Sequence, residues 1–209
     1  MVNKNVKLVA VDMDGTLLDS GKNAPADFES WVLSHPEIQT VLASGRQYAT
    51  LRDMFPSLNE CLMYVADNGS FVFKQGKMIY SNAISEEDIR WCIEYFGAMP
   101  GLDLILCGAK AAYMKHSSGL AEENGRMYYH SLEFVDSLEE CIGKDIIAKI
   151  AVFIDEYRAE EVYNSLSGIP ETIAAVLSGD SWIDVANRSV SKGSAMEAIE
   201  ESLHIKKEE

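Results

Sequence analysis

The chain has 209 residues, of which 47% are hydrophobic and 24% are charged, as is usual for a soluble globular protein. Its net charge is −15, from 33 acidic and 18 basic residues, so neither nucleic acid nor an anionic membrane surface is expected as a partner. No segment approaches the roughly 20 apolar residues of a membrane span. Asp12 and Asp14 interrupt the only apolar run near the N-terminus, so we predict no signal peptide and expect a cytoplasmic protein.

The four cysteines are widely spaced, with no Cys-x-x-Cys pair and no pair of histidines nearby. This spacing predicts neither a zinc site nor a disulfide framework. We interpret the cysteines as buried, reduced thiols. None of the four histidines has a partner at metal-ligand spacing, and we interpret them as structural or surface residues.

The first third of the chain alternates between short apolar strands and amphipathic helices. Strands are predicted at 7–11, 39–43 and 62–66, with helices at 25–33 and just after residue 46. This alternation predicts right-handed crossovers between parallel strands, and the first strand reads as fully buried. Each strand ends in a polar cluster, and ligands of such sheets bind beyond the carboxyl ends of the strands.

The pattern changes after residue 70, where a hairpin is predicted around Gln75-Gly76. A helix capped by Ser85 follows, and then come strands at 102–106, 111–115, 149–154 and 172–177 with a helix at 156–166. This mixture predicts a separate α+β domain at residues 83–181, inserted into an α/β domain of residues 1–82 and 182–209. The last elements predicted are a strand at 182–186 and a helix at 192–203, which Ser191 caps.

The most distinctive motif is Asp12-Met13-Asp14-Gly15-Thr16, directly after the first strand. Two carboxylates placed there can hold a divalent cation and supply a nucleophile, and phosphoryl transfer needs both. A pair of this kind can also form a helix-capping turn, but the preceding strand and the following Gly-Thr argue against that alternative.

Four further residues are less specific signals, and each has a structural alternative. Ser44 can bind phosphate, cap the following helix, or do both. Arg46 can contact a substrate or make a surface ion pair. Asn68 is better explained as a turn residue than as a ligand, because Asn-Gly is a turn signal by itself. Lys192 can be merely solvated, but its place before Gly193 at a helix start favours a function.

Taken in order, these motifs resemble those of the haloacid dehalogenase superfamily of phosphohydrolases. The Asp12–Thr16 segment is similar to its first motif, Ser44-Gly45-Arg46 to its second, and Lys192-Gly193 to its third, the lysine motif. The Asp67-Asn68-Gly69 turn and the long insertion after it resemble the Cof-type branch, whose cap domain lies at that point. The resemblance implies a Rossmann-like α/β core with a parallel sheet and an inserted α+β cap.

The resemblance also implies a Mg²⁺-dependent phosphomonoester hydrolase that acts on small phosphorylated metabolites, with sugar phosphates as the main class. Asp12 would be the nucleophile that forms an aspartyl-phosphate, and Asp14 the general acid and base. Lys192 would stabilise the shared charge of nucleophile and phosphate, and Asp12 with the Asp14 carbonyl would bind Mg²⁺. The substrate-binding residues would be Ser44, Gly45, Arg46 and Asn68.

The fourth motif of the superfamily, an acidic cluster that supplies the remaining metal ligands, would follow the helix at 192–203, and the sequence ends at Glu209 before it. The string from Gly179 through Asp180 to Asp184 imitates this motif, but it precedes Lys192. We therefore interpret it as the strand that returns from the insertion, with a rearranged site through Asp180 or Asp184 as the alternative. The expected consequences are weak magnesium binding and an exposed apolar sheet edge beside the first strand, which favours homo-oligomers or aggregation.

A second hypothesis follows, in which the chain is a truncated, catalytically impaired protein that binds phosphate ligands without turnover. A phospho-acceptor signalling domain is a third, which the Gly-Thr after Asp14 and the large insertion disfavour. Within the insertion, no spacing singles out one substrate contact among the candidates Lys110, Lys115, His116 and Arg126.

Overall fold

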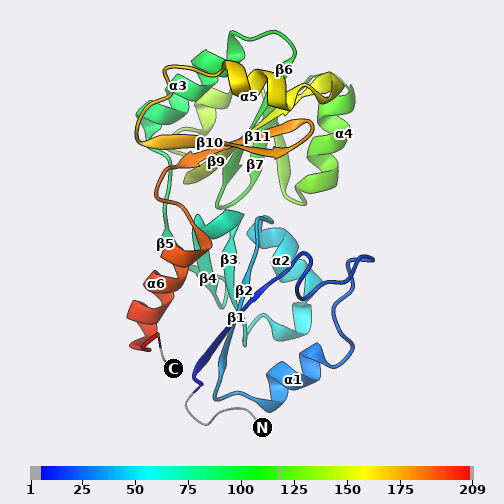
Figure 1. Ribbon diagram of the computed structural model, residues 1–209, viewed down its shortest axis with the longest axis vertical. Coiled ribbons are helices and arrows are strands. Elements are labelled where there is room, and N and C mark those ends of the chain that lie inside the picture. The colour runs from blue at the N-terminus through cyan, green and yellow to red at the C-terminus, as the bar shows by residue number, and fades with distance from the viewer. Residues whose placement is uncertain (1–5, 118, 208–209) are drawn as a thin grey trace. The chain divides into compact units, whose positions relative to one another are not determined.

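The computed structural model describes residues 6–117 and 119–207, and its chain divides into two compact units (Figure 1). The first unit contains the described residues up to Ser81 and from Val190 onward, and the second unit contains Asn82–Ser189. The predicted fold class, a parallel α/β sheet interrupted by a separate α+β insertion, is confirmed.

The first unit is built on a five-stranded sheet in the order β1-β2-β3-β4-β5. The strands are β1 (Leu8–Asp12), β2 (Gln39–Ala43), β3 (Met63–Ala66), β4 (Phe71–Lys74) and β5 (Lys77–Ser81). The first three are parallel, as predicted, and β4 and β5 are antiparallel. Asp12 is level with Ala43, and Ala43 with Val65, so the carboxyl ends of the parallel strands lie at one edge of the sheet.

Helices cover both faces of this sheet. They are α1 (Phe28–Ser34), α2 (Tyr48–Met54) and α6 (Lys192–Leu203), with short 3-10 turns η1 (Pro56–Leu58) and η2 (Asp67–Gly69). On one face, Ala195 and Ile199 of α6 pack in a fully buried cluster with Met63 and Val65. Tyr64, between those two strand residues, points to the opposite face, where its ring lies 5.6 Å from that of Tyr48 in α2.

Strand β1 lies at the edge of the sheet and is only half buried. Within the described chain it pairs with β2 alone, and Ala10 at its centre is exposed. The prediction of a fully buried first strand is therefore wrong. Its apolar sequence reads like a central strand, but burial depends on how many neighbours the strand has.

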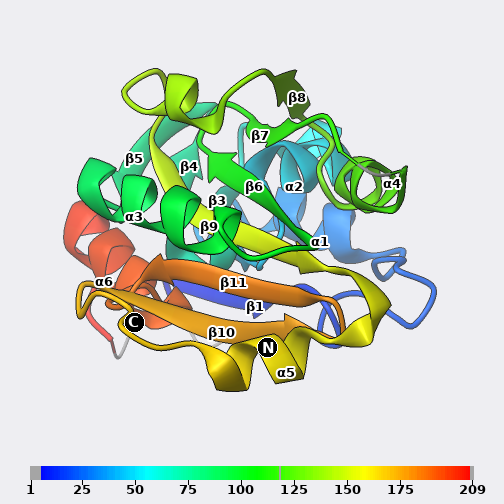
Figure 2. The same ribbon diagram turned by 90° about the horizontal axis from the view of Figure 1, so that it is seen from above.

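The second unit contains a six-stranded sheet in the order β10-β11-β9-β6-β7-β8, which Figure 2 shows from above. Its strands are β6 (Leu102–Gly108), β7 (Ala112–Lys115), β8 (Leu132–Val135), β9 (Ile147–Ile154), β10 (Ile173–Gly179) and β11 (Trp182–Asn187). Its helices are α3 (Glu86–Gly97), α4 (Gly119–Tyr128) and α5 (Ala159–Ser165), with η3 (Leu138–Cys141) and η4 (Asp155–Tyr157). Helix α4 and strand β8 were not predicted from the sequence.

The predicted start of α3 is confirmed, since the Ser85 side chain accepts a hydrogen bond from the Asp88 amide at 3.1 Å. The predicted boundary after residue 181 differs from that of the structure, which lies after Ser189. Strand β11 belongs to the second unit because it pairs with both β9 and β10.

The cysteines only partly follow the prediction. All four are free thiols, and Cys92, Cys107 and Cys141 are buried, but Cys61 is exposed. Burial raises the pKa of the Cys92 thiol to about 12.

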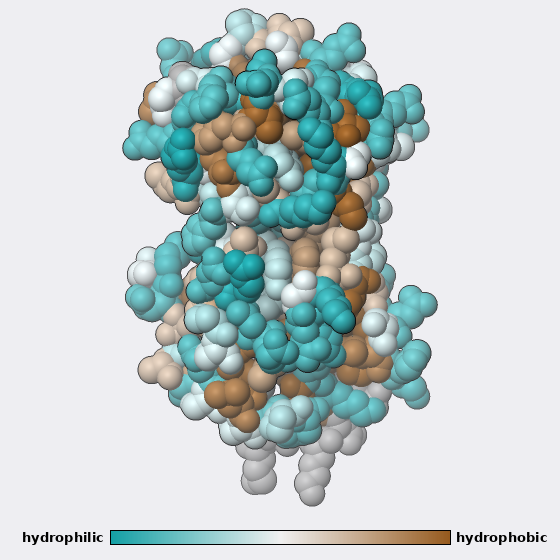
Figure 3. All heavy atoms as spheres, turned by 180° about the vertical axis from the view of Figure 1, so that it is seen from behind, coloured by the Kyte–Doolittle hydropathy of each residue, from teal (hydrophilic) through white to brown (hydrophobic). Residues whose placement is uncertain are grey.

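Among the described residues, no helix has both the length and the apolar character needed to cross a bilayer. On the face drawn in Figure 3, hydrophilic residues predominate and hydrophobic ones form small separate groups.

Candidate active site

The first and third predicted motifs meet in the first unit. Asp12 is the last residue of β1, Lys192 is the first residue of α6, and the lysine Nζ donates a hydrogen bond to Asp12 Oδ1 across 180 residues of sequence. Thr16 Oγ1 lies 3.4 Å from the other carboxylate oxygen of Asp12. Both members of the Asp12–Lys192 pair are partly exposed, so the site is open to solvent on this side.

The start of α6 is fixed by two local contacts. Ser191 and Ser194 form a reciprocal capping box, in which the Ser191 hydroxyl accepts from the Ser194 amide at 2.9 Å. Gly69 packs so closely under this turn that a Cβ there would lie 2.1 Å from the Ser191 carbonyl oxygen. The turn after β3 therefore fixes the position of the first turn of α6, and with it the position of Lys192 relative to Asp12.

Asp14 is held by two cations, in a fork from Arg46 and a single bond from Lys22. Arg46 donates from Nη2 to Asp14 Oδ1 at 2.7 Å and from Nε to Oδ2 at 3.0 Å. Lys22 Nζ donates to Oδ1 at 2.8 Å. The hydrogen bond from Arg46 is the main cause that holds the pKa of Asp14 well below its usual range, with a smaller contribution from Lys22 and with burial opposing both.

Arg46 therefore makes an ion pair, as one of its two alternatives predicted, and its partner is a candidate catalytic residue. The other alternative, a contact with substrate, stays a prediction. Lys22 was not predicted to be part of the site. Nothing in its spacing from the Asp12–Thr16 motif marked it, because it reaches Asp14 through a turn whose shape the sequence pattern did not show.

The second motif is packed against the Asn68 turn. Ser44 is buried and its hydroxyl accepts from the Arg46 amide at 3.1 Å, whereas α2 begins after Gln47, so Ser44 is not the cap of that helix. The Asn68 amide donates to the Ser44 carbonyl at 2.9 Å, and a Cβ on Gly45 would lie 2.9 Å from Asn68 Oδ1. Asn68 has a left-handed backbone, with φ of 58°, as the turn alternative predicts.

The residues present offer a partial magnesium site. Among the described residues, no three carboxylate, histidine or cysteine side chains come together as a metal cluster. Asp12 has a carboxylate oxygen whose hydrogen bond from Thr16 is long, and the Asp14 main-chain carbonyl is another hard oxygen donor. Such donors fit Mg²⁺, an ion that commonly keeps several of its waters. Asp180 and Asp184 belong to the second unit, where Asp184 pairs with Lys149 at 3.4 Å.

The candidate substrate contacts of the insertion are Lys110, Lys115, His116 and Arg126. Within the second unit, His116 pairs with Glu122 at 3.0 Å, and the Arg126 guanidinium lies 4.5 Å from the centre of the Phe134 ring. These contacts explain the two side chains as surface partners of their own unit. They do not single out a ligand-binding residue.

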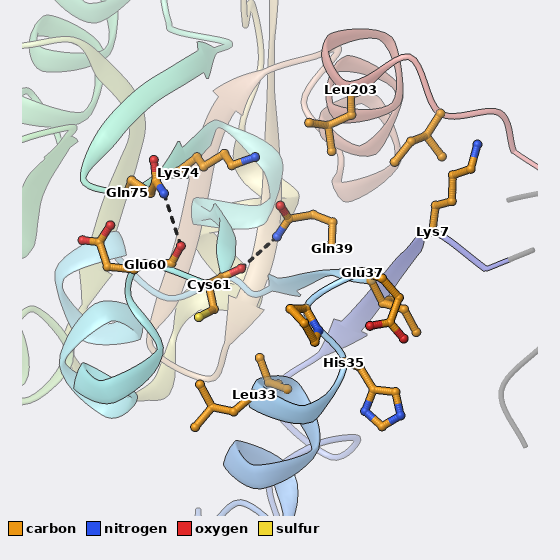
Figure 4. A pocket seen from close by; sticks show the side chains of 14 residues that line it. Lys7, Leu33, His35, Glu37, Gln39, Glu60, Cys61, Lys74, Gln75 and Leu203 are labelled. Carbon is orange, nitrogen blue, oxygen red and sulfur yellow. Dashed lines mark hydrogen bonds between the residues drawn. The ribbon is translucent and has the colours of Figure 1, made fainter. Parts of the chain in front are cut away.

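A cavity of about 570 Å³ lies elsewhere in the first unit, and Figure 4 shows its lining. Lys7 and Gln39 mark the amino ends of β1 and β2, and Leu203 lies at the end of α6, so the cavity is at the opposite end of the strands from Asp12. Gln39 Nε2 donates to the Cys61 carbonyl at 3.0 Å across its wall. The cavity is therefore separate from the candidate active site.

The arrangement of these residues is typical of one class of protein. Asp12 and Asp14 lie at the carboxyl end of the first parallel strand, and Lys192 reaches Asp12 from the last helix of the described chain. The model of the haloacid dehalogenase-like hydrolases matches residues 9–209, and the chain belongs to this family. The resemblance predicted from the motifs is confirmed. The chain is thus a hydrolase by family, and the relatives described below include named phosphatases.

One relative is the 5-amino-6-(5-phospho-D-ribitylamino)uracil phosphatase YbjI of Escherichia coli (strain K12), which is 29% identical over 94% of this chain and 73% of its own length. The crystal structure of TM0651 from Thermotoga maritima is 19% identical and superimposes with a TM-score of 0.83 over 97% of this chain and 77% of its own. The subclass IIB sugar phosphatase BT4131 is 21% identical, with a TM-score of 0.73 over 96% and 77% of the two chains. At these identities the two structures establish the likeness of fold.

Proposed function

We propose that this chain is a phosphomonoester hydrolase of small phosphorylated metabolites, with phosphorylated sugars and polyols as the main class. The observation that carries the proposal is the contact between Asp12 and Lys192. It brings together, at the carboxyl end of β1, two residues that are 180 positions apart in the sequence. The name of the E. coli relative, a phosphatase of a phosphoribityl compound, supports the substrate class.

In the first step, a carboxylate oxygen of Asp12 attacks phosphorus, and the bond from phosphorus to the substrate oxygen breaks. Asp14 gives its proton to the leaving alkoxide, and an aspartyl-phosphate remains on Asp12. Lys192 holds one oxygen of Asp12 in place and offsets the charge that builds up between nucleophile and phosphate.

In the second step, water attacks phosphorus and the bond to Asp12 breaks, which restores the Asp12 carboxylate and releases phosphate. Asp14, now a carboxylate, takes the proton from the attacking water. Arg46 lowers the pKa of Asp14 when no substrate is present, so this carboxyl can carry a proton in the first step only after its contact with Arg46 is weakened.

The phosphate site is proposed from the second motif and from the cations around Asp14. The Ser44 hydroxyl and the backbone at Gly45 would bind phosphate oxygens, and Arg46 would contact them once it leaves Asp14. Asn68 would contribute mainly by shaping the turn beside Gly45. Asp12 and the Asp14 carbonyl would hold Mg²⁺, which neutralises phosphate oxygens when bound.

The test is phosphate release from a panel of sugar and polyol phosphates and an aryl phosphate, with Mg²⁺ and with EDTA. We expect metal-dependent turnover that falls at least about a thousandfold in Asp12→Asn, because the covalent route is lost. Asp53→Asn is the matched control, since Asp53 pairs on the surface with its neighbour Arg52. Turnover retained in a folded Asp12→Asn variant would rule out the proposed nucleophile.

The second candidate function is phosphate binding without turnover. It is favoured by the sparse set of metal donors around Asp12 among the described residues. A folded protein that binds phosphate but releases none from any substrate would establish it.

Two finer points belong to the same proposal. The four free cysteines support a reducing compartment such as the cytoplasm.

The exposed edge of β1 supports a homo-oligomer formed along that strand. The test is sedimentation of wild type and Ala10→Lys, because a lysine on an edge strand opposes strand pairing.

A further inference from the structure

Lys22 belongs to the long connection between β1 and α1, ten residues after Asp12 (Figure 1). Its side chain is 62% exposed, and its Nζ reaches back to the carboxylate of Asp14 at 2.8 Å. No packing holds so exposed a side chain in one place, so the ion pair with Asp14 is what determines its position.

The backbone around Lys22 adopts a conformation that directs this side chain toward Asp14. Lys22 has a left-handed backbone, with φ of 63°, which is unfavourable for a residue with a side chain. Asp19 supports the turn from both sides: its carbonyl accepts from the Lys22 amide at 3.0 Å, and its carboxylate accepts from the Asn23 amide at 2.8 Å. A strained residue maintained by its surroundings points to a function for that residue.

The charges around Asp14 indicate what the function is. Lys22 and Arg46 both donate to Asp14 Oδ1, so one carboxylate oxygen takes two charge-assisted hydrogen bonds. A phosphate group carries more negative charge and more acceptor oxygens than a carboxylate, so it competes well for both cations. The chain as a whole has a net charge of −15, and a phosphate site in it depends on a local group of cations.

We propose that Lys22 is a phosphate-binding residue of this site, which is paired with Asp14 in the free protein and moves to the phosphate group when a ligand binds. The proposal rests on the proposed function for the position of the phosphate. It adds a residue outside the four motifs, and it makes Asp14 and the phosphate alternative partners of one lysine.

The test is calorimetric binding of inorganic phosphate in EDTA to wild type, Lys22→Met, Lys22→Arg and Lys77→Met. We expect Lys22→Met to weaken binding about tenfold, which corresponds to ~1.4 kcal/mol, and Lys22→Arg to keep most of the affinity. Lys77→Met is the matched control, because Lys77 is an exposed lysine of β5 and its loss changes the net charge equally. We expect its affinity to stay within about twofold of wild type.

A double-mutant cycle with Asp14→Asn separates exchange of partners from simple repulsion. If Lys22 must leave Asp14 to bind phosphate, Asp14→Asn tightens phosphate binding, and Lys22→Met then costs more affinity in the Asp14→Asn background than in wild type. Additive effects, an unchanged affinity in Lys22→Met, or an equal loss in Lys77→Met would each overturn the proposal. A wild type that binds no phosphate would overturn it as well.

Turnover does not enter this experiment, so the two proposals can fail separately. A protein that releases no phosphate from any substrate but shows the expected cycle would refute the hydrolase and leave the role of Lys22 intact. An active hydrolase in which the effects of Lys22→Met and Asp14→Asn are additive would refute the role of Lys22 and leave the hydrolase proposal intact.

Discussion

The partners of Asp14 decide whether this residue can act as the proposed general acid. As a general acid it must carry a proton near neutral pH, but Arg46 and Lys22 stabilise its charged form when no ligand is bound. Substrate phosphate would resolve this conflict by drawing the cations away. Under the proposed mechanism, the free protein holds Asp14 in place as a carboxylate, and ligand binding would allow it to be protonated.

The lowered pKa of Asp14 predicts how stability depends on pH. Because the folded value lies below the unfolded value of about 3.9, the contribution of Arg46 is fully present above that pH and is lost as the pH falls below it. In urea unfolding, the stability difference between wild type and Arg46→Met should be constant from pH 7 to about 5 and should shrink below about pH 4. A difference that grows toward acid would show that Arg46 does not stabilise the Asp14 carboxylate.

At the scale of elements, the turn after β3 and the start of α6 depend on each other. Gly69 has φ of 105° and lies directly under the Ser191 carbonyl, so this glycine serves both the turn and the docking of the helix that carries Lys192. The sequence predicted both the turn at Asn68-Gly69 and the helix at 192–203, but not that the start of the helix packs on the turn.

Gly69→Ala should therefore destabilise the first unit far more than Gly76→Ala. Gly76 also has a positive φ, of 73°, but its Cβ would meet nothing within 4 Å, so it carries only the backbone cost of about 1 kcal/mol. At Gly69 the clash with the Ser191 carbonyl adds to that cost, and we expect a total above ~3 kcal/mol. Equal losses for the two variants in urea unfolding would mean that α6 can shift without penalty.

At the scale of the whole molecule, the chain combines two units with separate cores. The candidate active site, from Asp12 to Lys192, is assembled entirely within the first unit. The proposed metal donors, Asp12 and the Asp14 carbonyl, lie at the end of β1 and just after it, so metal binding should act on the stability of that unit.

Magnesium should stabilise the protein by mass action. With a dissociation constant of about 1 mM, 10 mM Mg²⁺ adds ~1.4 kcal/mol, which raises Tm by roughly 3–6 °C for a chain of this size. Asp12→Asn should lose this shift, and NaCl at equal ionic strength serves as the control in a thermal scan. A wild type that does not respond to Mg²⁺ would favour phosphate binding without turnover.

The sequence by itself determined the parallel strands, the capped helices and the order of the motifs, because periodicity and capping are local properties that short stretches of residues express. It placed Asp12, Ser44 and Lys192 at strand ends and a helix start, and the structure has them there. Contacts across long separations were decided only by the tertiary structure. These include the place of β11 in the second sheet and the hydrogen bonds from Arg46 to Asp14. The turn that brings Lys22 to Asp14 is local, but its shape was likewise visible only in the structure. The sequence of a strand does not determine how many strands pair with it. The sequence around an exposed lysine likewise does not show which group its side chain will contact.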